Sequence, residues 1–303
     1  FAGGKIKLSK DLAADAITKN ISQIVNLDMD TAALAISEIV DETMSNAARV
    51  HTVEQGHETS SRTLIAFGGA APLHVARVAE KLKVSSIIIP TNASVGSAVG
   101  FLKAPVGYEV VKSLRTLLKA FPVKKVNDLL KIMREEAEKV IENKSEKNNF
   151  LEERFAYMRY AGQGHEIKVP IENNLLSIRH VDSIKSSFEK KYEKLYSRIL
   201  PNADIEILTW SLSLSIQSEN ENEYKELNSY TNREESTLVD FIDYHSEKKI
   251  KVPYFERNEL NPGDLIMGQC VISEEQTTII VSKNFNTKVL GNKFLKMEYI
   301  KNE

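Results

Sequence analysis

The hydrophobic and polar positions of the chain change from mainly helical to mainly strand periodicity, which divides it into a mixed first part and a strand-rich second part. An apolar stripe at helical spacing covers residues 9–26, and Asp30-Thr31 then begin a long helix. The face of this helix that carries Asp41 reads as solvated. Its apolar stripe is expected to consist of Leu34, Ile36, Ile39, Val40, Met44, Ala47 and Val50.

Residues 63–102 alternate strand, Gly-Gly turn, helix, strand, Gly-rich turn and helix. This order predicts parallel strands that are joined by right-handed crossovers. The stretch 107–111 either adds a strand to this part or leads out of it. A charged amphipathic helix is predicted over 123–141, and the polar residues 142–149 mark the clearest internal boundary.

Strand patterns dominate the second part. Two predicted strands bracket the turn Ala161-Gly162-Gln163-Gly164 and indicate a hairpin, which a helix over 181–198 follows. Residues 207–217 alternate as in a half-buried strand, with Leu208, Trp210, Leu212, Leu214 and Ile216 on one face. The acidic stretch 218–235 reads as a mobile loop. The short strands that follow it fit a small β-barrel or sandwich.

The stretch from Thr63 to His74 carries the clearest sign of a binding site. It reads as a short apolar strand, a sharp turn at Gly68-Gly69, and a helix with Pro72 in its first turn, where the missing N–H costs nothing. The two glycines let a ligand approach the main chain without meeting a Cβ. The free N–H groups of the first helical turn then face the usual ligand position of an open α/β sheet. The motif favours a nucleotide site; a small-residue packing turn is the alternative.

Composition and charge narrow the class of protein. The 303 residues, of which 42% are hydrophobic and 27% charged, suffice for two domains with a large core. The formal net charge of −2 gives no reason to expect nucleic acid or an anionic membrane as partner. No apolar run approaches the roughly 20 residues that span a bilayer. The single cysteine permits no internal disulfide, which fits a reducing cytoplasm.

The residues around the glycine turn resemble a known family. The run from Phe67 to His74, FGGAAPLH, resembles the FGGAGPLH signature of hydantoinase A/5-oxoprolinase proteins, with Ala71 where the common pattern has glycine. The run from Gly96 to Leu102, the segment Arg159 to Gly164, and stretches between Pro253 and Thr278 are similar to further family segments. The resemblance extends along the whole chain and includes subunits of acetone and acetophenone carboxylases.

The resemblance implies an α/β plus β fold. Residues 1–118 are expected to form the adenosine-side C-terminal lobe of an actin/sugar-kinase-type ATPase, 119–150 a helical connector, and 151–303 a β-rich C-terminal domain with a hairpin, a helix and a small barrel or sandwich. In such a fold the polar face of the long helix can also flank the nucleotide cleft. We expect the chain to be the C-terminal part of a longer polypeptide, since it starts at Phe1 and contains no Asp-bearing Gly-Gly-Thr phosphate loop.

The resemblance also assigns candidate site residues. His74 is expected either to contact ligand or to close the first helical turn through a local hydrogen bond. Arg159, Tyr160 and Gln163 are further cleft candidates, because polar groups beside a glycine turn can converge on a cleft; a structural hairpin is the alternative. The expected nucleotide-binding residues are Gly68, Gly69, Ala70, Ala71, Pro72 and His74.

Other reactive residue types give weaker signals. His51, Glu54 and His57 have metal-ligand spacing, but Gly56 and the predicted helix end separate them, so we expect no metal there. Cys270 lies in a predicted strand without a nearby histidine and is expected to be a core residue. No catalytic residue can be assigned from the sequence.

Relatives of this family use ATP to activate an otherwise inert group. In the hydantoinase/5-oxoprolinase branch the oxygen of a cyclic amide is phosphorylated before water opens the ring; in the carboxylase branch the enolate of a ketone is phosphorylated and carboxylated. We predict the first activity, with ATP and Mg²⁺ held mainly by an absent N-terminal half. A ketone carboxylase subunit and a non-catalytic assembly subunit are the alternatives. The expected partners are that N-terminal half, a B-type hydantoinase subunit or domain, and a small-molecule substrate.

Overall fold

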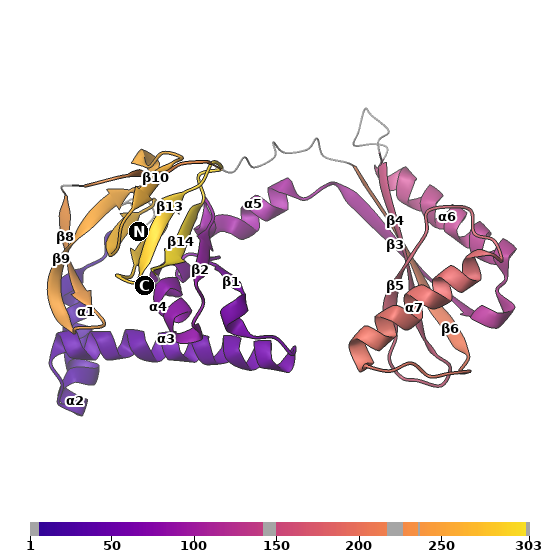
Figure 1. The fold of residues 1–303 in the computed structure, drawn as a ribbon, viewed down its shortest axis with the longest axis horizontal. Coiled ribbons are helices and arrows are strands. Elements are labelled where there is room, and N and C mark those ends of the chain that lie inside the picture. The colour runs from indigo at the N-terminus through magenta and orange to yellow at the C-terminus, as the bar shows by residue number, and fades with distance from the viewer. Residues whose placement is uncertain (1–5, 142–149, 217–226, 236, 301–303) are drawn as a thin grey trace. The chain divides into compact units, whose positions relative to one another are not determined.

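The computed structural model describes residues 6–141, 150–216, 227–235 and 237–300. The chain forms two compact units (Figure 1): unit 1 consists of Phe1–Lys103 and Asn222–Glu303, and unit 2 of Ala104–Glu221. Unit 1 therefore combines the two ends of the sequence. The predicted boundary at 142–149 lies outside the described residues, as does the first part of the predicted loop at 218–235.

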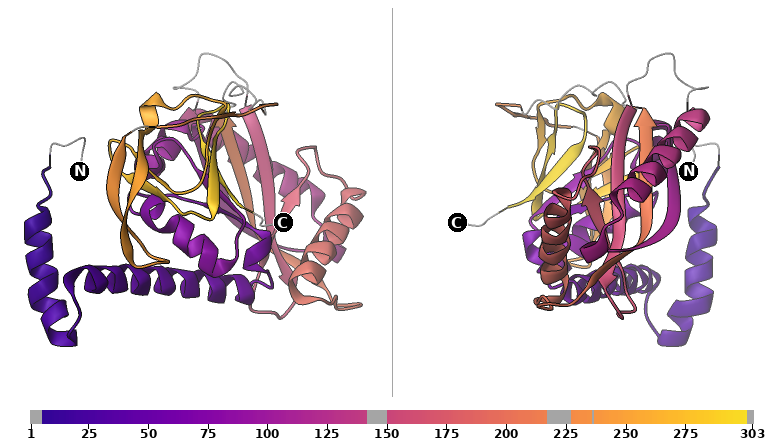
Figure 2. Two further views of the ribbon diagram at one scale, coloured as in Figure 1. Left: turned by 60° about the vertical axis from the view of Figure 1, so that its left-hand side comes forward. Right: turned by 90° about the vertical axis from the view of Figure 1, so that its right-hand side faces the viewer.

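The helices of unit 1 begin with an interrupted helical stretch. The predicted helix at 9–26 is divided into α1 (Lys10–Ile17), a π-helical turn and α2 (Gln23–Val25), and Asn26 ends it with a left-handed backbone at φ 56°. The long helix α3 (Met29–Glu54) follows and takes a different direction from α1 (Figure 2). Its N-cap is Asp28, whose side chain accepts a hydrogen bond from the N–H of Thr31 at 3.1 Å, so the helix begins before the predicted Asp30-Thr31 cap.

The first sheet of unit 1 contains strands from both ends of the chain. The parallel pair β1 (Thr63–Ile65) and β2 (Ser86–Ile89) is joined through α4 (Ala71–Leu82), as predicted, and α5 (Gly96–Lys103) follows β2. The sheet order is β1-β2-β14-β13-β10-β7. The four added strands are β7 (Thr231–Asn232), β10 (Asp264–Ile266), β13 (Phe285–Val289) and β14 (Leu295–Tyr299).

The second sheet of unit 1 has the order β12-β11-β9-β8. Helix α4 lies in one core with side chains of both sheets: its Val75, Ala79 and Leu82 are buried together with Ile87 of β2 and Ile272 of β11. Such a core can form only when the C-terminal strands have joined the N-terminal helix and strands. The strands of this sheet are β8 (Leu238–Asp243), β9 (Lys248–Glu256), β11 (Cys270–Ser273) and β12 (Thr278–Val281).

The division of the chain differs from the boundaries expected at residues 118 and 150. The C-terminal strands do not form a separate barrel or sandwich, because β14 pairs antiparallel with β2, with Ile87 opposite Met297. This pairing satisfies the backbone groups on the free edge of β2. The residues expected to act as a helical connector instead carry α6 (Val123–Ile141), whose apolar face is part of the core of unit 2. No helix in the described ranges is both long and apolar enough to cross a bilayer.

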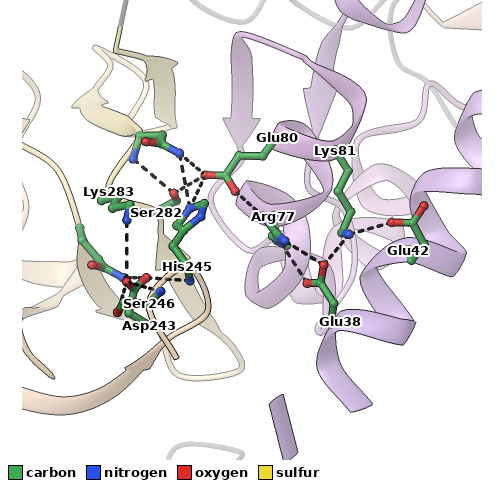
Figure 3. A network of polar contacts seen from close by, with 12 residues as sticks. Glu38, Glu42, Arg77, Glu80, Lys81, Asp243, His245, Ser246, Ser282 and Lys283 are labelled. Carbon is green, nitrogen blue, oxygen red and sulfur yellow. Dashed lines mark hydrogen bonds and ion pairs between the residues drawn. The ribbon is translucent and has the colours of Figure 1, made fainter. Parts of the chain in front are cut away.

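Helix α3 is attached to α4 by its polar face, which contradicts the prediction that this face is solvated. Asp41 and Ser45 are buried, and Glu38 binds both Arg77 and Lys81 of α4 at 2.8 and 2.6 Å (Figure 3). The predicted core stripe lies outward instead. Its exposed members are Ile39, Val40, Met44 and Val50, with exposed fractions of 67%, 40%, 37% and 58%.

A network of polar side chains continues from α4 to the strands. Glu80 contacts Arg77 within α4 and His245 of the β8–β9 turn, the latter at 3.3 Å (Figure 3). It also accepts from Asn284 of the β12–β13 turn at 2.9 Å. The hydroxyl of Ser282 donates to the same carboxylate. Helix α4 is thus fixed by ion pairs and hydrogen bonds on one side and by apolar contacts on the other.

Unit 2 is an antiparallel sheet with two helices on one face. Its order is β3-β6-β4-β5, and β4 and β5 form the predicted hairpin around Gly162, which has φ 90°. Helices α6 and α7 share one core with Trp210, Leu212 and Met158. The elements are β3 (Gly107–Leu117), β4 (Phe150–Tyr160), β5 (Ile167–Ile171), α7 (His180–Tyr196) and β6 (Ile205–Ile216).

A β-bulge changes the predicted alternation of β6. Thr209 is opposite Tyr157 and Ile207 is opposite Met158, so Leu208 is an extra residue in the ladder. As a result Ile207 is fully buried in the core, whereas Leu208 is only partly buried. The prediction placed Leu208 on the core face, because a regular period of two cannot reveal an inserted residue.

Because ion pairs join α3 to α4, we expect the attachment of α3 to weaken in acid. Hydrogen bonds from Arg77 and Lys81 lower the pKa of Glu38 from 4.5 to about 2, against a smaller opposing effect of partial burial. Because the folded-state pKa is depressed, this stabilisation is present above pH 4.5 and is lost as the pH falls toward about 2. We expect Glu38→Gln to remove this part of the pH dependence of unfolding, measured by denaturant titration at several pH values. Glu54→Gln, at an exposed position near the end of α3, is the control, and equal pH profiles for Glu38→Gln and the native chain would contradict the prediction.

Candidate functional site

The glycine turn lies between β1 and α4 and is fixed on two sides. Gly68 has φ 108°, a conformation that favours glycine, and its N–H donates to the carbonyl of Ala93 at 2.8 Å. Ala93 belongs to the turn after β2, which contains Asn92 at φ 58°. Of the two adjacent glycines, only Gly68 therefore requires backbone freedom, and Gly69 is not in the left-handed region.

The turn between β11 and β12 meets the glycine turn from the other side. The hydroxyl of Thr277 donates to the carbonyl of Gly69 at 2.6 Å, and the N–H of Glu274 closes the turn on the carbonyl of Thr277 at 2.9 Å. Thr277 is buried, so this hydrogen bond is shielded from water. A C-terminal hairpin is thus held directly against the glycine turn.

A cleft of about 1240 Å³ opens between these turns, large enough for a nucleotide or another cofactor-sized molecule. All its lining residues belong to unit 1. The apolar side chains among them include Leu260, Val289 and Leu295, which are buried. The polar and small residues that line it are Gly69, Ala70, Thr91, Asn92, Ser94, Glu256, Arg257, Asn258, Ser273, Glu274, Glu275, Gln276, Thr277, Thr278 and Lys293.

Two of the charged residues of the cleft form a pair. Arg257 and Glu274 are 2.6 Å apart, with side chains 9% and 12% exposed. Burial raises the pKa of Glu274 and lowers the pKa of Arg257, so each ion depends on its partner. Arg257 also donates to the carbonyls of Ile89 and Lys293, which binds three segments together. The pair is therefore a structural feature of the cleft wall. Because Glu274 neutralises the charge of Arg257, this arginine offers little attraction to an anion.

The donor set of the cleft fits the nucleoside part of ATP better than its phosphates. Most of the remaining polar side chains are amides and hydroxyls, and the exposed acids Glu256 and Glu275 lie there with Lys293. At the glycine turn, α4 begins without a side-chain cap; Pro72 has no N–H, and the N–H of Leu73 donates to the carbonyl of Ala70 at 3.1 Å. In the described part of the chain, no group of three or more His, Cys, Asp or Glu residues is placed to hold a metal ion.

The structure separates the predicted nucleotide-binding residues. Gly69 and Ala70 line the cleft, whereas Gly68, Ala71, Pro72 and His74 are not among its lining residues. Pro72 lies in the first turn of α4 as predicted. His74 does not close the first helical turn through a local hydrogen bond: its Nδ1 lies 2.8 Å from Oδ1 of Asp41 on α3. Burial raises the pKa of Asp41, an effect that the contact with His74 opposes.

The second group of predicted cleft residues lies in unit 2, and each of them is bonded within that unit. Arg159 donates to Glu206 at 2.8 Å. The buried hydroxyl of Tyr160 accepts from the N–H of Leu200 at 3.1 Å, and the amide of Gln163 donates to the hydroxyl of Tyr192 at 2.8 Å. These contacts match the structural-hairpin alternative.

The residues with weaker sequence signals are His51, Glu54, His57 and Cys270. His51 and Glu54 are exposed on α3, and His57 follows the helix after Gly56, which has φ 70°. Cys270 is buried in β11, as predicted, and burial raises the pKa of its thiol to about 12, which suits a core residue.

Sequence reasoning missed the cleft residues of the C-terminal strands. The segments 256–260 and 273–278 lie in stretches that resemble the family, but nothing in the sequence placed them beside a motif some 200 positions earlier. The helical spacing of Glu38, Asp41, Glu42 and Ser45 was the available sign that α3 buries a polar face.

Comparison with protein families gives two matches that together cover most of the chain. Residues 1–110 match the hydantoinase/oxoprolinase family model, and residues 120–300 match the model of the hydantoinase/oxoprolinase C-terminal domain. Among curated proteins, the alpha subunit of caprolactamase from Pseudomonas jessenii is 26% identical over 92% of the chain, and the acetone carboxylase beta subunit from Xanthobacter autotrophicus is 23% identical over 99%. The 5-oxoprolinase of Saccharomyces cerevisiae is 23% identical over 92%.

The chain covers less than half of each of these relatives: 41% of the caprolactamase subunit, 44% of the acetone carboxylase subunit and 22% of the 5-oxoprolinase. Two solved structures share the fold over 99% of the chain and 44% of their own length. A nucleotide-free acetone carboxylase gives a TM-score of 0.81 at 21% identity, and the ATP-dependent caprolactamase from P. jessenii gives 0.75 at 23%. These likenesses confirm the predicted fold class, a mixed α/β structure with a β-rich C-terminal part.

An added methyl group should change the free energy of unfolding differently at the two glycines of the turn. We expect Gly68→Ala to lower the free energy of unfolding by about 1–3 kcal/mol, because alanine is strained at this positive φ. Gly69→Ala is the matched control: its Cβ would meet only the Cβ of Ser94, at 4.0 Å, so we expect little change. Denaturant unfolding of both variants measures the difference, and an equal loss in the two would refute the assignment of strain to Gly68.

Proposed function

Because the chain belongs to the hydantoinase/oxoprolinase family, we propose that it is the C-terminal portion of an ATP-dependent hydrolase that opens a cyclic amide. Two relatives, a caprolactamase and a 5-oxoprolinase, are named for activity on cyclic amides. In this activity the amide oxygen is phosphorylated first. Water then adds to the activated carbon, the ring C–N bond breaks with the nitrogen leaving as an amine, and a second water releases phosphate from the acyl phosphate that remains.

The observation that carries the proposal is the cleft beside Gly69. A glycine turn, the uncapped start of α4 and a wall of amides and hydroxyls form one hollow of nucleotide size. When bound, ATP supplies the phosphoryl group that activates the substrate. The residues of this chain would bind and orient its nucleoside end, and the described residues contain no cationic cluster in the cleft for the triphosphate. We therefore assign phosphate and Mg²⁺ binding to the rest of a longer polypeptide.

The exposed stripe of α3 supports such an arrangement. Ile39, Val40, Met44 and Val50 face away from α4, and Leu12 and Ile24 of the preceding helices are 71% and 75% exposed. Apolar surface of this extent usually contacts another protein surface. We propose that the N-terminal half of the polypeptide covers it and that a B-type subunit completes the enzyme, in a cytoplasmic complex.

A ketone carboxylase is the second candidate. It is favoured by the acetone carboxylase neighbour, whose TM-score of 0.81 exceeds the 0.75 of the caprolactamase. Fold similarity at this identity does not separate the two reactions, since both begin with phosphorylation of an oxygen atom. A non-catalytic assembly subunit is the third candidate, motivated by Ala71 and by the lack of a phosphate loop in this chain.

Substrate-stimulated ATP consumption distinguishes these candidates. We expect the complete polypeptide, assembled with its B-type partner and Mg²⁺, to hydrolyse ATP faster with a cyclic amide such as 5-oxoproline, a hydantoin or caprolactam. Acetone with bicarbonate tests the carboxylase, and residues 1–303 alone serve as a control that should hydrolyse no ATP. Stimulation by acetone only would replace the hydrolase by the carboxylase. No stimulation by any of these compounds would contradict both enzymes and favour the assembly subunit.

The role of the glycine turn in ATP binding is tested by a larger side chain. We expect Gly69→Val in the assembled enzyme to raise the KM for ATP at least tenfold, because the isopropyl group would project into the cleft that Gly69 lines. Gly69 is not at positive φ, so the variant should fold, which a melting curve checks. Gly164→Val, in the exposed hairpin turn of unit 2, is the control. A folded Gly69→Val enzyme with an unchanged KM would remove the nucleotide assignment.

A further inference from the structure

The β11–β12 turn presents two polar side chains to the cleft that form no hydrogen bond or ion pair with another described residue. Thr277 is bonded to Gly69 and Glu274 to Arg257, so both ends of the turn are fixed. Glu275 and Gln276, between them, line the cleft, and neither takes part in a hydrogen bond or ion pair within the described part of the chain. A rigid turn with two unengaged polar side chains is well placed to recognise a ligand.

Burial varies across the cleft and orients a nucleotide within it. Leu260, Val289 and Leu295 line the cleft and are at most 3% exposed. Leu73 and Val95, which are 39% and 46% exposed, add apolar surface that suits a purine ring. Glu275 is exposed and thus lies at the rim. Three acids and two bases line the cleft, and one acid and one base pair with each other, so a triphosphate would be repelled rather than held. The base therefore fits inward, the phosphates outward and the ribose between them.

We propose that Glu275 and Gln276 bind the ribose hydroxyls of ATP, with Glu275 accepting from the vicinal 2′- and 3′-hydroxyls. This inference rests on the proposed ATP-dependent function and adds a specificity to it. A carboxylate has two acceptor oxygens and so can accept from both hydroxyls, the chemistry that acidic residues use toward ribose in dinucleotide folds. The hydrogen bond from Thr277 to Gly69 makes Thr277 a positioning residue, because it keeps this turn beside the nucleotide turn.

The test compares ATP with 2′-deoxy-ATP in the assembled enzyme, using substrate-dependent ATP consumption as the readout. We expect the native enzyme to prefer ATP about tenfold in kcat/KM, which corresponds to one hydrogen bond to a charged group. Glu275→Ala should raise the KM for ATP, leave kcat nearly unchanged and bring the two nucleotides to equal kcat/KM. Glu275→Gln, which keeps one acceptor oxygen, should retain part of the preference. Glu259→Ala, an exposed glutamate of the neighbouring loop that does not line the cleft, is the control.

The outcomes separate this inference from the function on which it rests. A native enzyme without preference for ATP, or a Glu275→Ala enzyme that keeps the preference, overturns ribose recognition by this turn. If Gly69→Val still raises the KM for ATP in that case, the nucleotide cleft stands and only the ribose assignment is lost. A Thr277→Val variant adds a second test: it should weaken the preference for ATP, and an unchanged preference would contradict its positioning role.

Discussion

The antiparallel pairing of β14 with β2 is the interaction on which the architecture of unit 1 depends. It places Leu295 opposite Ile89 and Met297 opposite Ile87, and it joins strands that are more than two hundred residues apart. Without it, β1 and β2 would be a two-stranded parallel sheet with both edges unpaired. The same pairing brings the hairpins of the C-terminal strands beside the glycine turn, so the sheet and the cleft form together.

Helix α4 shows how one element serves two different interfaces. Val75, Val78, Ala79 and Leu82 pack between the sheets, while Arg77 and Lys81 bind the acids of α3. Apolar packing is non-directional and stabilises the core, whereas the ion pairs fix the register of α3 and remain open to screening by salt. Helix α3 can therefore keep its apolar stripe for another surface.

The sequence predicted the local elements well and the long-range contacts poorly. The strand–turn–helix unit at Gly68, the amphipathic helix α6 and the hairpin at Gly162 follow from periodicity and turn residues, which are local properties. The attachment of α3 was predicted on the wrong face, because an apolar stripe normally marks the buried side and here it does not. The bulge at Leu208 and the pairing of β14 with β2 depend on partners that no local pattern identifies.

The chemistry of the cleft follows from this division between local and distant contributions. The local motif supplies backbone groups at Gly69 and Ala70, which any ligand with acceptors could use, whereas the distant segments supply the side chains that select one. Burial of the Arg257–Glu274 pair removes hydration from both ions. Their mutual attraction and the two carbonyl acceptors of Arg257 offset that loss. The pair fixes the position of the β11–β12 turn at the wall of the cleft. In the proposed nucleotide site, the side chains at the tip of that turn would meet the ligand beside the glycine turn.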